Sequence, residues 1–234
     1  MSIITIQYCF RLPDNTKEVF NLEIDEQRLE LIGNAPENPP EWTKLDFHQC
    51  SNCSFSPSTH PYCPLILNLV NIVNRFDNII SYDKIHMDVI TQERSISQHT
   101  TAQTGISSLM GLVIATSGCP HAAFFKPMAR FHLPLASEEE TVYRAASMYL
   151  LAQYFLNKEG KKADFELDGL KHIYDNIQIV NSAIAERLRA ATKTDSSINA
   201  IIRLDMYAKA MPFVIAESLD ELRNLFVPYL TLQN

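Results

Sequence analysis

Four of the five cysteines occupy positions from which they could hold a metal ion. Cys50 and Cys53 form a C-x-x-C pair, in which a tight turn can direct two thiolates toward one tetrahedral ion. Cys63 follows in the same turn-rich segment, and Cys119 is a distant fourth candidate. We therefore predict that Cys50, Cys53, Cys63 and Cys119 are the ligands of one metal ion or small metal cluster.

Two of these cysteines share a local pattern. Cys63 and Cys119 each precede a proline that begins an expected helix, and proline favours the first helical position. Each cysteine would then be the N-cap residue, where free backbone N–H groups and the helix dipole stabilise a thiolate and lower its pKa. The fifth cysteine, Cys9, lies in an expected strand, and we interpret it as a small core residue.

The ligand type suits either zinc or an iron–sulfur cluster. The spacing matches neither common ferredoxin pattern, so zinc is favoured. If Cys119 is not a ligand, then His48, His60 or His121 would complete a Cys3His site. A fully ligated site is closed and structural. The expected protein is therefore a zinc-binding, non-enzymatic interaction or regulatory module, with a protein partner or a second copy as its further binding partner.

A thiol-based enzyme or redox sensor is the alternative. Cys119 would be its nucleophile, His121 or His132 the base, and Cys50 and Cys53 a resolving pair. The C-x-x-C pair lacks a βαβ context, which disfavours a thioredoxin-like protein. An iron–sulfur sensor could use the same four cysteines. Cysteines that merely fill the core are the remaining interpretation.

Basic residues gather beside Cys119. His121, Lys126, Arg130 and His132 could form a pocket for an anion. A solvated basic face with hydrogen bonds to sulfur is favoured instead, because charge clusters without a motif usually lie on the surface. Farther along, Arg144 is expected to pair with a carboxylate such as Asp205, which interrupts an apolar helix face.

Composition limits the classes of function. The chain has 234 residues, a hydrophobic fraction of 46% and a formal net charge of -7. That charge argues against nucleic-acid binding. We find no signal peptide and no apolar stretch near the roughly 20 residues that a membrane span requires. A cytoplasmic location with reduced thiols is expected, which favours metal ligands over disulfides.

The segments that must position the cysteines include both predicted strands and predicted helices. Alternating apolar residues predict strands at Ile3–Leu12, Glu18–Ile24, Trp42–Phe47 and Lys84–Ser97, the first two forming a hairpin. Helical spacing and caps predict helices at 64–76, 106–116, 120–131 (bent at Pro127), 137–156, 168–191 and 195–210, and a short one opening at Ser218.

The expected fold class is α+β. A small N-terminal antiparallel sheet precedes a C-terminal helical bundle, and the Cys-rich loop lies at their junction. Residues 1–103 form the β-rich part with the loop and one helix, and residues 104–234 form the bundle. We expect the two parts to make one continuous structural unit.

Several motifs are similar to those of an uncharacterised bacterial family of unknown function. They are His48-Gln49-Cys50-Ser51-Asn52-Cys53, His60-Pro61-Tyr62-Cys63-Pro64 and Ser117-Gly118-Cys119-Pro120-His121. The stretches Pro127–Pro134 and Tyr143–Leu150 extend the likeness over nearly the whole chain. The resemblance implies a bacterial, cytoplasmic protein and brings no activity with it.

Overall fold

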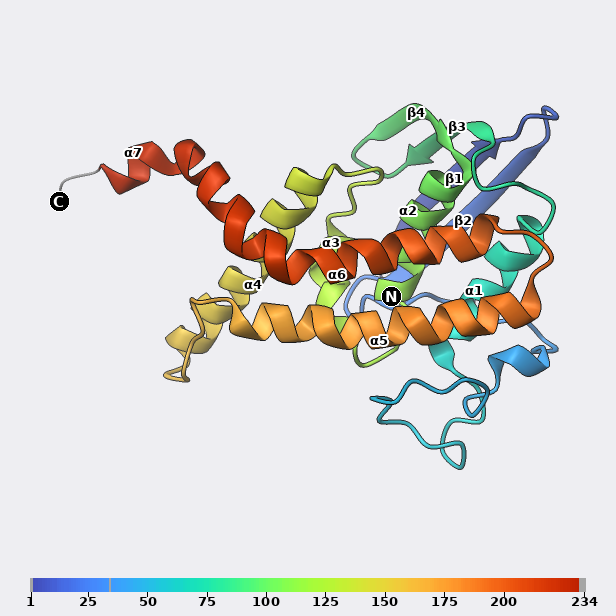
Figure 1. The fold of residues 1–234 in the computed structure, drawn as a ribbon, viewed down its shortest axis with the longest axis horizontal. Coiled ribbons are helices and arrows are strands. Elements are labelled where there is room, and N and C mark those ends of the chain that lie inside the picture. Colours follow the sequence, from blue (N-terminus) through green and yellow to red (C-terminus); the bar gives the residue numbers. More distant parts are fainter. Residues whose placement is uncertain (1, 34, 232–234) are drawn as a thin grey trace.

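The N-terminal half is built on a four-stranded antiparallel sheet, seen in the computed structural model of the chain, which describes residues 2–33 and 35–231 (Figure 1). The strands run in the order β2-β1-β3-β4. Their bounds are β1 (Ile3–Arg11), β2 (Lys17–Asp25), β3 (Lys84–Ile90) and β4 (Ser95–Thr101). The predicted hairpin is confirmed, with Ile6 opposite Leu22 and Tyr8 opposite Phe20, all four buried. Alternation places these apolar side chains on the face that packs against the helices.

Two helices pack close to this sheet: α1 (Pro64–Arg75) and the central helix α2 (Ala102–Ala115). Most side chains of α2 are buried, which explains why its sequence is apolar on all sides. The helix approaches the sheet closely at Gly105. A Cβ atom there would lie 2.9 Å from Ile85 Cδ1 and 3.1 Å from the Phe10 ring, so glycine is required for this contact.

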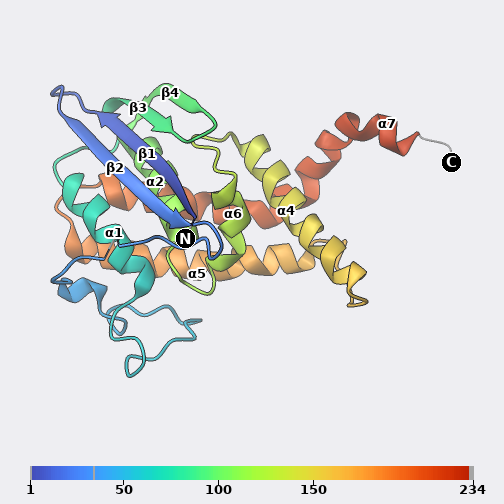
Figure 2. The ribbon, with the colours of Figure 1, turned by 180° about the vertical axis from the view of Figure 1, so that it is seen from behind.

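The C-terminal half is helical and completes an α+β fold, as predicted. Its helices are α3 (Lys126–Arg130), α4 (Glu138–Lys158), α5 (Asp168–Ala191), α6 (Ser196–Leu222) and α7 (Val227–Leu230). The α5–α6 pair covers α2 on the side away from the sheet, as Figures 1 and 2 show from opposite directions. The predicted start of the helix at residue 137 is confirmed by a capping box, in which Ser137 and Glu140 each accept a hydrogen bond from the other's backbone N–H.

Two strand predictions are wrong in part. Trp42–Phe47 is no strand: a 3₁₀ helix at Glu41–Thr43 is followed by turns, because local bonds from Thr43 and Lys44 to preceding carbonyls occupy the backbone. The segment Lys84–Ser97 is not one strand, because it contains the whole of β3 and the start of β4. Its chain reverses at Thr91, whose hydroxyl accepts hydrogen bonds from the backbone N–H groups of Glu93 and Arg94.

The prediction that a helix ends at Ala210 and another opens at Ser218 is also wrong. Helix α6 continues through Pro212 to Leu222. Proline costs a helix about 3 kcal/mol, and here α6 packs along both α5 and α2, which outweighs that cost. The following α7 extends away from the body (Figure 1). Within residues 2–33 and 35–231, no helix is long and apolar enough to cross a membrane.

Candidate metal centre

The Cys-rich loop is closed at its base by a short backbone ladder. Leu45 N–H donates to Pro61 O at 3.0 Å, and Cys63 N–H donates to Thr43 O at 2.9 Å. The isolated bridge between Lys44 and Tyr62 lies between these bonds. The two ends of the loop are therefore fixed side by side, and the intervening residues, which contain the C-x-x-C pair, have no helix or strand of their own.

The C-x-x-C pair forms a turn in which Cys53 N–H donates to Cys50 O at 3.0 Å. The turn is fastened to α5 by the Asn52 side chain, whose Nδ2 donates to Asn176 O at 3.1 Å and lies 3.0 Å from Asn176 Oδ1. A third fastening comes from the Cys119 segment, because His121 Nε2 lies 2.7 Å from Asn52 O. The turn is thus held by groups distant in sequence.

Cys63 is the N-cap residue of α1 and Pro64 occupies the first helical turn, as predicted. Its sulfur faces the backbone N–H groups of Ile66 and Leu65, which act to lower its pKa. This is the arrangement expected when the free N–H groups of a helix start meet a potential anion.

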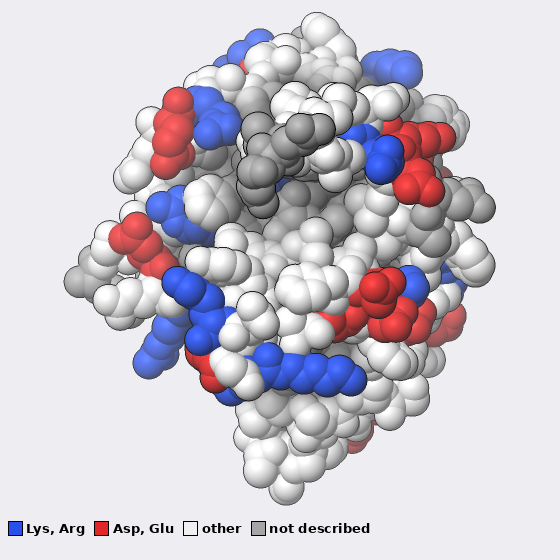
Figure 3. All heavy atoms as spheres, turned by 90° about the vertical axis from the view of Figure 1, so that its left-hand side faces the viewer, with Lys and Arg blue, Asp and Glu red and all other residues white. Residues whose placement is uncertain are grey.

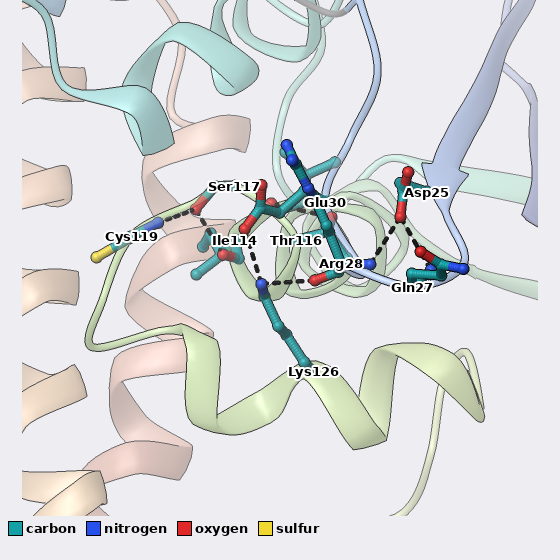
Figure 4. Close-up of polar contacts among 10 residues, drawn as sticks. Asp25, Gln27, Arg28, Glu30, Ile114, Thr116, Ser117, Cys119 and Lys126 are labelled. Atoms are coloured by element: carbon teal, nitrogen blue, oxygen red, sulfur yellow. Dashed lines mark hydrogen bonds and ion pairs between the residues drawn. The ribbon is translucent and has the colours of Figure 1, made fainter. Parts of the chain in front are cut away.

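Cys119 follows the end of α2 in a tight turn. Gly118 has φ +82°, a left-handed conformation that favours glycine. The Ser117 hydroxyl accepts a hydrogen bond from Cys119 N–H at 3.3 Å and donates to Ile114 O at 2.7 Å (Figure 4). The helix expected from Pro120 is wrong. Residues 120–122 form a turn, then a 3₁₀ helix spans Ala123–Phe125, and α3 begins only at Lys126.

All four predicted ligands line one cavity of about 30 Å³, here called the cysteine cavity. Cys50 and Cys53 come from the loop, Cys63 from the start of α1 and Cys119 from the turn after α2. Val180 and Ile184 of α5 complete the wall. The thiols are free and half-buried. Within the described ranges, however, no group of three or more His, Cys, Asp or Glu side chains has a geometry that could hold a metal ion.

The thiols of this cavity influence one another. Burial, together with the neighbouring thiols Cys63, Cys119 and Cys53, raises the pKa of Cys50 to about 12. Burial also raises the pKa of Cys119, although the N–H groups of Ala122 and His121 oppose that rise. The pKa of Cys63 is likewise raised, chiefly by burial. The expected lowering of the thiol pKa at Cys63 and Cys119 is therefore wrong, because burial outweighs the N–H groups.

A buried arginine that we did not predict lies beside the cysteines. Arg187 of α5 is 2% exposed, and its guanidinium donates to Trp42 O, Lys44 O and Leu45 O at 2.7–3.0 Å. The ionised forms of Cys63, Cys50 and Cys53 would stabilise its charge. No carboxylate oxygen of the described chain lies within 4.0 Å of it. Its position between Ile184 and Leu188, on the apolar face of α5, is the feature of the sequence that could have indicated a buried arginine.

The three histidines considered as substitute ligands differ in position. His121 lines the cysteine cavity. The His60 ring stacks on Phe55 with centroids 3.9 Å apart, and its Nδ1 lies 3.0 Å from the Thr59 hydroxyl. His48 packs edge-on against Phe47. In a Cys3His site, His121 would therefore be the preferred histidine ligand.

The fifth cysteine lies elsewhere. Cys9 is on β1, on the face opposite the buried side chains Tyr8 and Phe10, and is only half-buried. The prediction that it is a core residue is wrong, because the register of β1 turns it away from the helices. This position makes it a natural control for experiments on the other four.

The basic stretch after Cys119 forms no common pocket. Lys126 pairs with Glu30 at 2.9 Å and donates to Arg28 O at 2.7 Å (Figure 4). Arg130 lies 3.6 Å from Glu26. These contacts fasten α3 to the loop after β2, and they agree with the favoured interpretation as a partly solvated face.

Comparison with known proteins gives a family and no activity. No curated protein and no solved structure matches the chain. A family model described as "Domain of unknown function (DUF6901)" matches residues 6–227. This agrees with the likeness to an uncharacterised family that the motifs indicated. Because the match spans nearly all of the chain, the protein belongs to the DUF6901 family of domains of unknown function.

Proposed function

We propose that Cys50, Cys53, Cys63 and Cys119 bind one zinc ion in a closed, structural site. The observation that carries the proposal is that four thiols from three separate segments line one small cavity. Binding would require the thiol side chains to rotate inward, because their present arrangement lacks the geometry of a ligand set. Zinc would also displace the thiol protons, which offsets the raised pKa of the buried thiols.

The charge of the surroundings supports this proposal. Zinc with four thiolates carries a net negative charge, and such a group is costly to bury without a nearby cation. Arg187 supplies a buried positive charge near Cys50, Cys53 and Cys63, and it is oriented by three carbonyl groups rather than by a carboxylate. The N–H groups at Cys63 and Cys119 face the same sulfurs.

The expected role of the ion is to strengthen the link between the loop, the start of α1 and the turn after α2, which hydrogen bonds already bring together. The loop between Leu45 and Pro61 has no helix or strand, so ordering its backbone is opposed by conformational entropy. A four-thiolate site leaves no open coordination position for a substrate. The function that we propose for the site is therefore non-enzymatic. An interaction or regulatory role for the helices stays a prediction.

The test is elemental analysis of protein purified under reducing conditions without added metal. We expect about one zinc per chain, as for a tetrahedral structural site. Cys50→Ser and Cys119→Ser should each lose most of the zinc. Cys9→Ser is the matched control and should retain it, because Cys9 lies on the outer face of β1. Equal zinc contents in Cys119→Ser and the wild type would exclude Cys119 as a ligand.

Other results would replace this proposal. Iron with inorganic sulfide and broad visible absorbance would identify an iron–sulfur cluster on the same thiols. Less than about half an equivalent of either metal, with every thiol free, would argue against a metal site. In that case rapid alkylation of Cys119 at neutral pH would favour the thiol-based alternative, although burial raises the pKa of this thiol.

A further inference from the structure

A second, larger cavity lies between helices α2, α4, α5 and α6 and the segment around α3. We call it the helical cavity. Its volume is about 250 Å³, which corresponds to about eight waters at liquid density. Apolar side chains such as Leu112, Phe125, Ile177 and Leu204 form much of its wall. Figure 3 shows that the surface on the side of α4 and α7 is hollowed, with side chains of both charges around the hollow.

Two arginines in this wall have no carboxylate partner among the side chains that the structure describes. Arg144 Nη2 donates to Met128 O and Phe131 O, both at 2.9 Å. Arg203 Nη2 donates to the Tyr207 hydroxyl at 3.1 Å, and its guanidinium lies 5.4 Å from the centre of that ring. In the part of the chain that the structure describes, neither forms an ion pair with an acidic side chain.

The predicted pairing of Arg144 with Asp205 is wrong. Asp205 instead pairs at 2.5 Å with Lys209, which lies one turn farther along α6. Helical spacing of four residues brings these two side chains together without any tertiary contact. Glu140 is the acidic residue whose charge acts on Arg144, but it is engaged in the capping box of α4. The two guanidinium groups therefore keep free donors.

The remaining polar groups of the wall are neutral. Asn181 of α5 is 3% exposed and lines the helical cavity. No other described residue forms a hydrogen bond with its amide, which faces the space of the cavity. His132 Nε2 lies 2.5 Å from the Tyr8 hydroxyl, which is also 3.0 Å from Ser108 Oγ. An amide that faces such a space can form its hydrogen bonds with water or with a bound ligand.

We propose that the helical cavity binds a small monocarboxylic acid with an apolar body. The carboxylate would accept hydrogen bonds from the free donors of Arg144, Arg203 and Asn181, and the body would contact the apolar wall. Arginine is suited to carboxylates because its planar fork can form two parallel hydrogen bonds. The formal net charge of the chain is -7, so its overall electrostatic field does not attract an anion. Binding of a carboxylate would therefore depend on the two arginines and the amide.

The probe for the test is octanoate, whose size suits the cavity. Isothermal titration calorimetry would compare it with 1-octanol, octylammonium and inorganic phosphate. We expect one octanoate per chain and binding of the other three at least about tenfold weaker, since each lacks either the carboxylate or the apolar body. Octanol or octylammonium binding as tightly as octanoate, or phosphate alone binding equally well, would overturn the proposal. So would the absence of octanoate binding at millimolar concentration.

Variants locate the bound carboxylate. Arg203→Met removes a guanidinium whose hydrogen bond among described residues goes to the Tyr207 hydroxyl, and we expect octanoate affinity to fall about tenfold or more. Lys209→Met, on the same helix but outside the cavity lining, is the matched control and should bind normally.

Asn181→Leu is the second variant, because it keeps a similar volume and removes the unpartnered amide. We expect it to weaken octanoate severalfold without lowering the melting temperature. If Arg203→Met and Asn181→Leu both bind octanoate within twofold of the wild type, the assignment is wrong. Circular dichroism of each variant excludes loss of the fold as the cause.

Discussion

The cysteine cavity and the helical cavity are built in opposite ways. The first is small and lies where irregular backbone is tied to α5 and to the turn around His121 by hydrogen bonds over long sequence separations. The second is larger and lies between regular helices, each of which contributes a few side chains. In the first, the chemistry resides in four copies of one uncommon residue. In the second, it resides in ordinary residues whose charge lacks a partner. A cluster of rare residues is visible in a sequence, whereas a missing partner is visible only in a fold.

Arg187→Met should have the largest effect and should act on the cysteine side. It would remove the guanidinium donor from the carbonyls of Trp42, Lys44 and Leu45, of which Lys44 O still accepts from Phe47 N–H. We expect a loss of about 3–5 kcal/mol in the free energy of unfolding, measured with urea. Arg187→Lys should fall between this variant and the wild type, because an ammonium cannot reproduce the planar fork.

The control for this experiment lies on the same helix. Arg189→Met removes an exposed arginine paired with Glu186 and should change stability by less than about 0.5 kcal/mol. The folded fraction of Arg187→Met should retain less zinc but bind octanoate normally. Loss of octanoate binding with retention of zinc would show that Arg187 supports the helical cavity and not the cysteine cavity.

A pH dependence should arise on the helical side. Burial, with the charge of Arg144, lowers the pKa of His132 from its ordinary value of 6.5 to about 3. The unfolded chain therefore binds a proton at pH values where the folded chain does not. This contribution to stability is fully present above pH 6.5 and is lost as the pH falls toward 3.

We expect the His132 contribution to fall by about 2 kcal/mol between pH 6.5 and pH 4.5. Urea unfolding of His132→Asn should show a shallower pH slope than that of the wild type. His172→Asn removes a histidine with an 84% exposed side chain and should keep the wild-type slope. Identical slopes in both variants would mean that His132 is protonated in the folded protein.

The smallest effects concern one glycine beside each cavity, and they should have opposite signs. Gly118→Ala imposes a side chain on a left-handed residue and should destabilise the protein by about 1 kcal/mol. Gly111→Ala lies within α2, where the new Cβ would be 3.7 Å from Leu204. It should stabilise the protein by about 0.5–1 kcal/mol. Urea midpoints of the two variants test this, and equal signs would contradict it.

Much of the fold follows from local patterns in the sequence. The alternation of Ile4, Ile6 and Tyr8 indicated one face of β1, on which Ile6 and Tyr8 are buried. The capping box of Ser137 and Glu140 identified the start of α4. Both depend on residues close together in the chain. The continuation of α6 through Pro212 could not be predicted, because it depends on packing against α2 and α5.

The candidate sites divide in the same manner. The shared cavity of Cys50, Cys53, Cys63 and Cys119 agrees with the predicted grouping of these residues, whereas their metal stays a proposal. Arg187 was missed because its acceptors, the carbonyls of Trp42, Lys44 and Leu45, are backbone groups that every residue carries. The helical cavity was missed because an unpaired Arg203 is recognised only when the neighbours that might have paired with it are known.

Helix α5 borders both cavities. Tyr174, Ile177 and Asn181 face the larger one, and Val180 and Ile184 face the smaller. A rotation of α5, or a shift along its axis, would change the shape of both cavities together, since neighbouring turns of one helix cannot move independently. If zinc binding changed the affinity for a ligand in the helical cavity by some factor, that ligand would change the affinity for zinc by the same factor, because thermodynamic linkage is reciprocal. Through α5, the occupancy of one cavity would therefore change the affinity of the other cavity for its ligand.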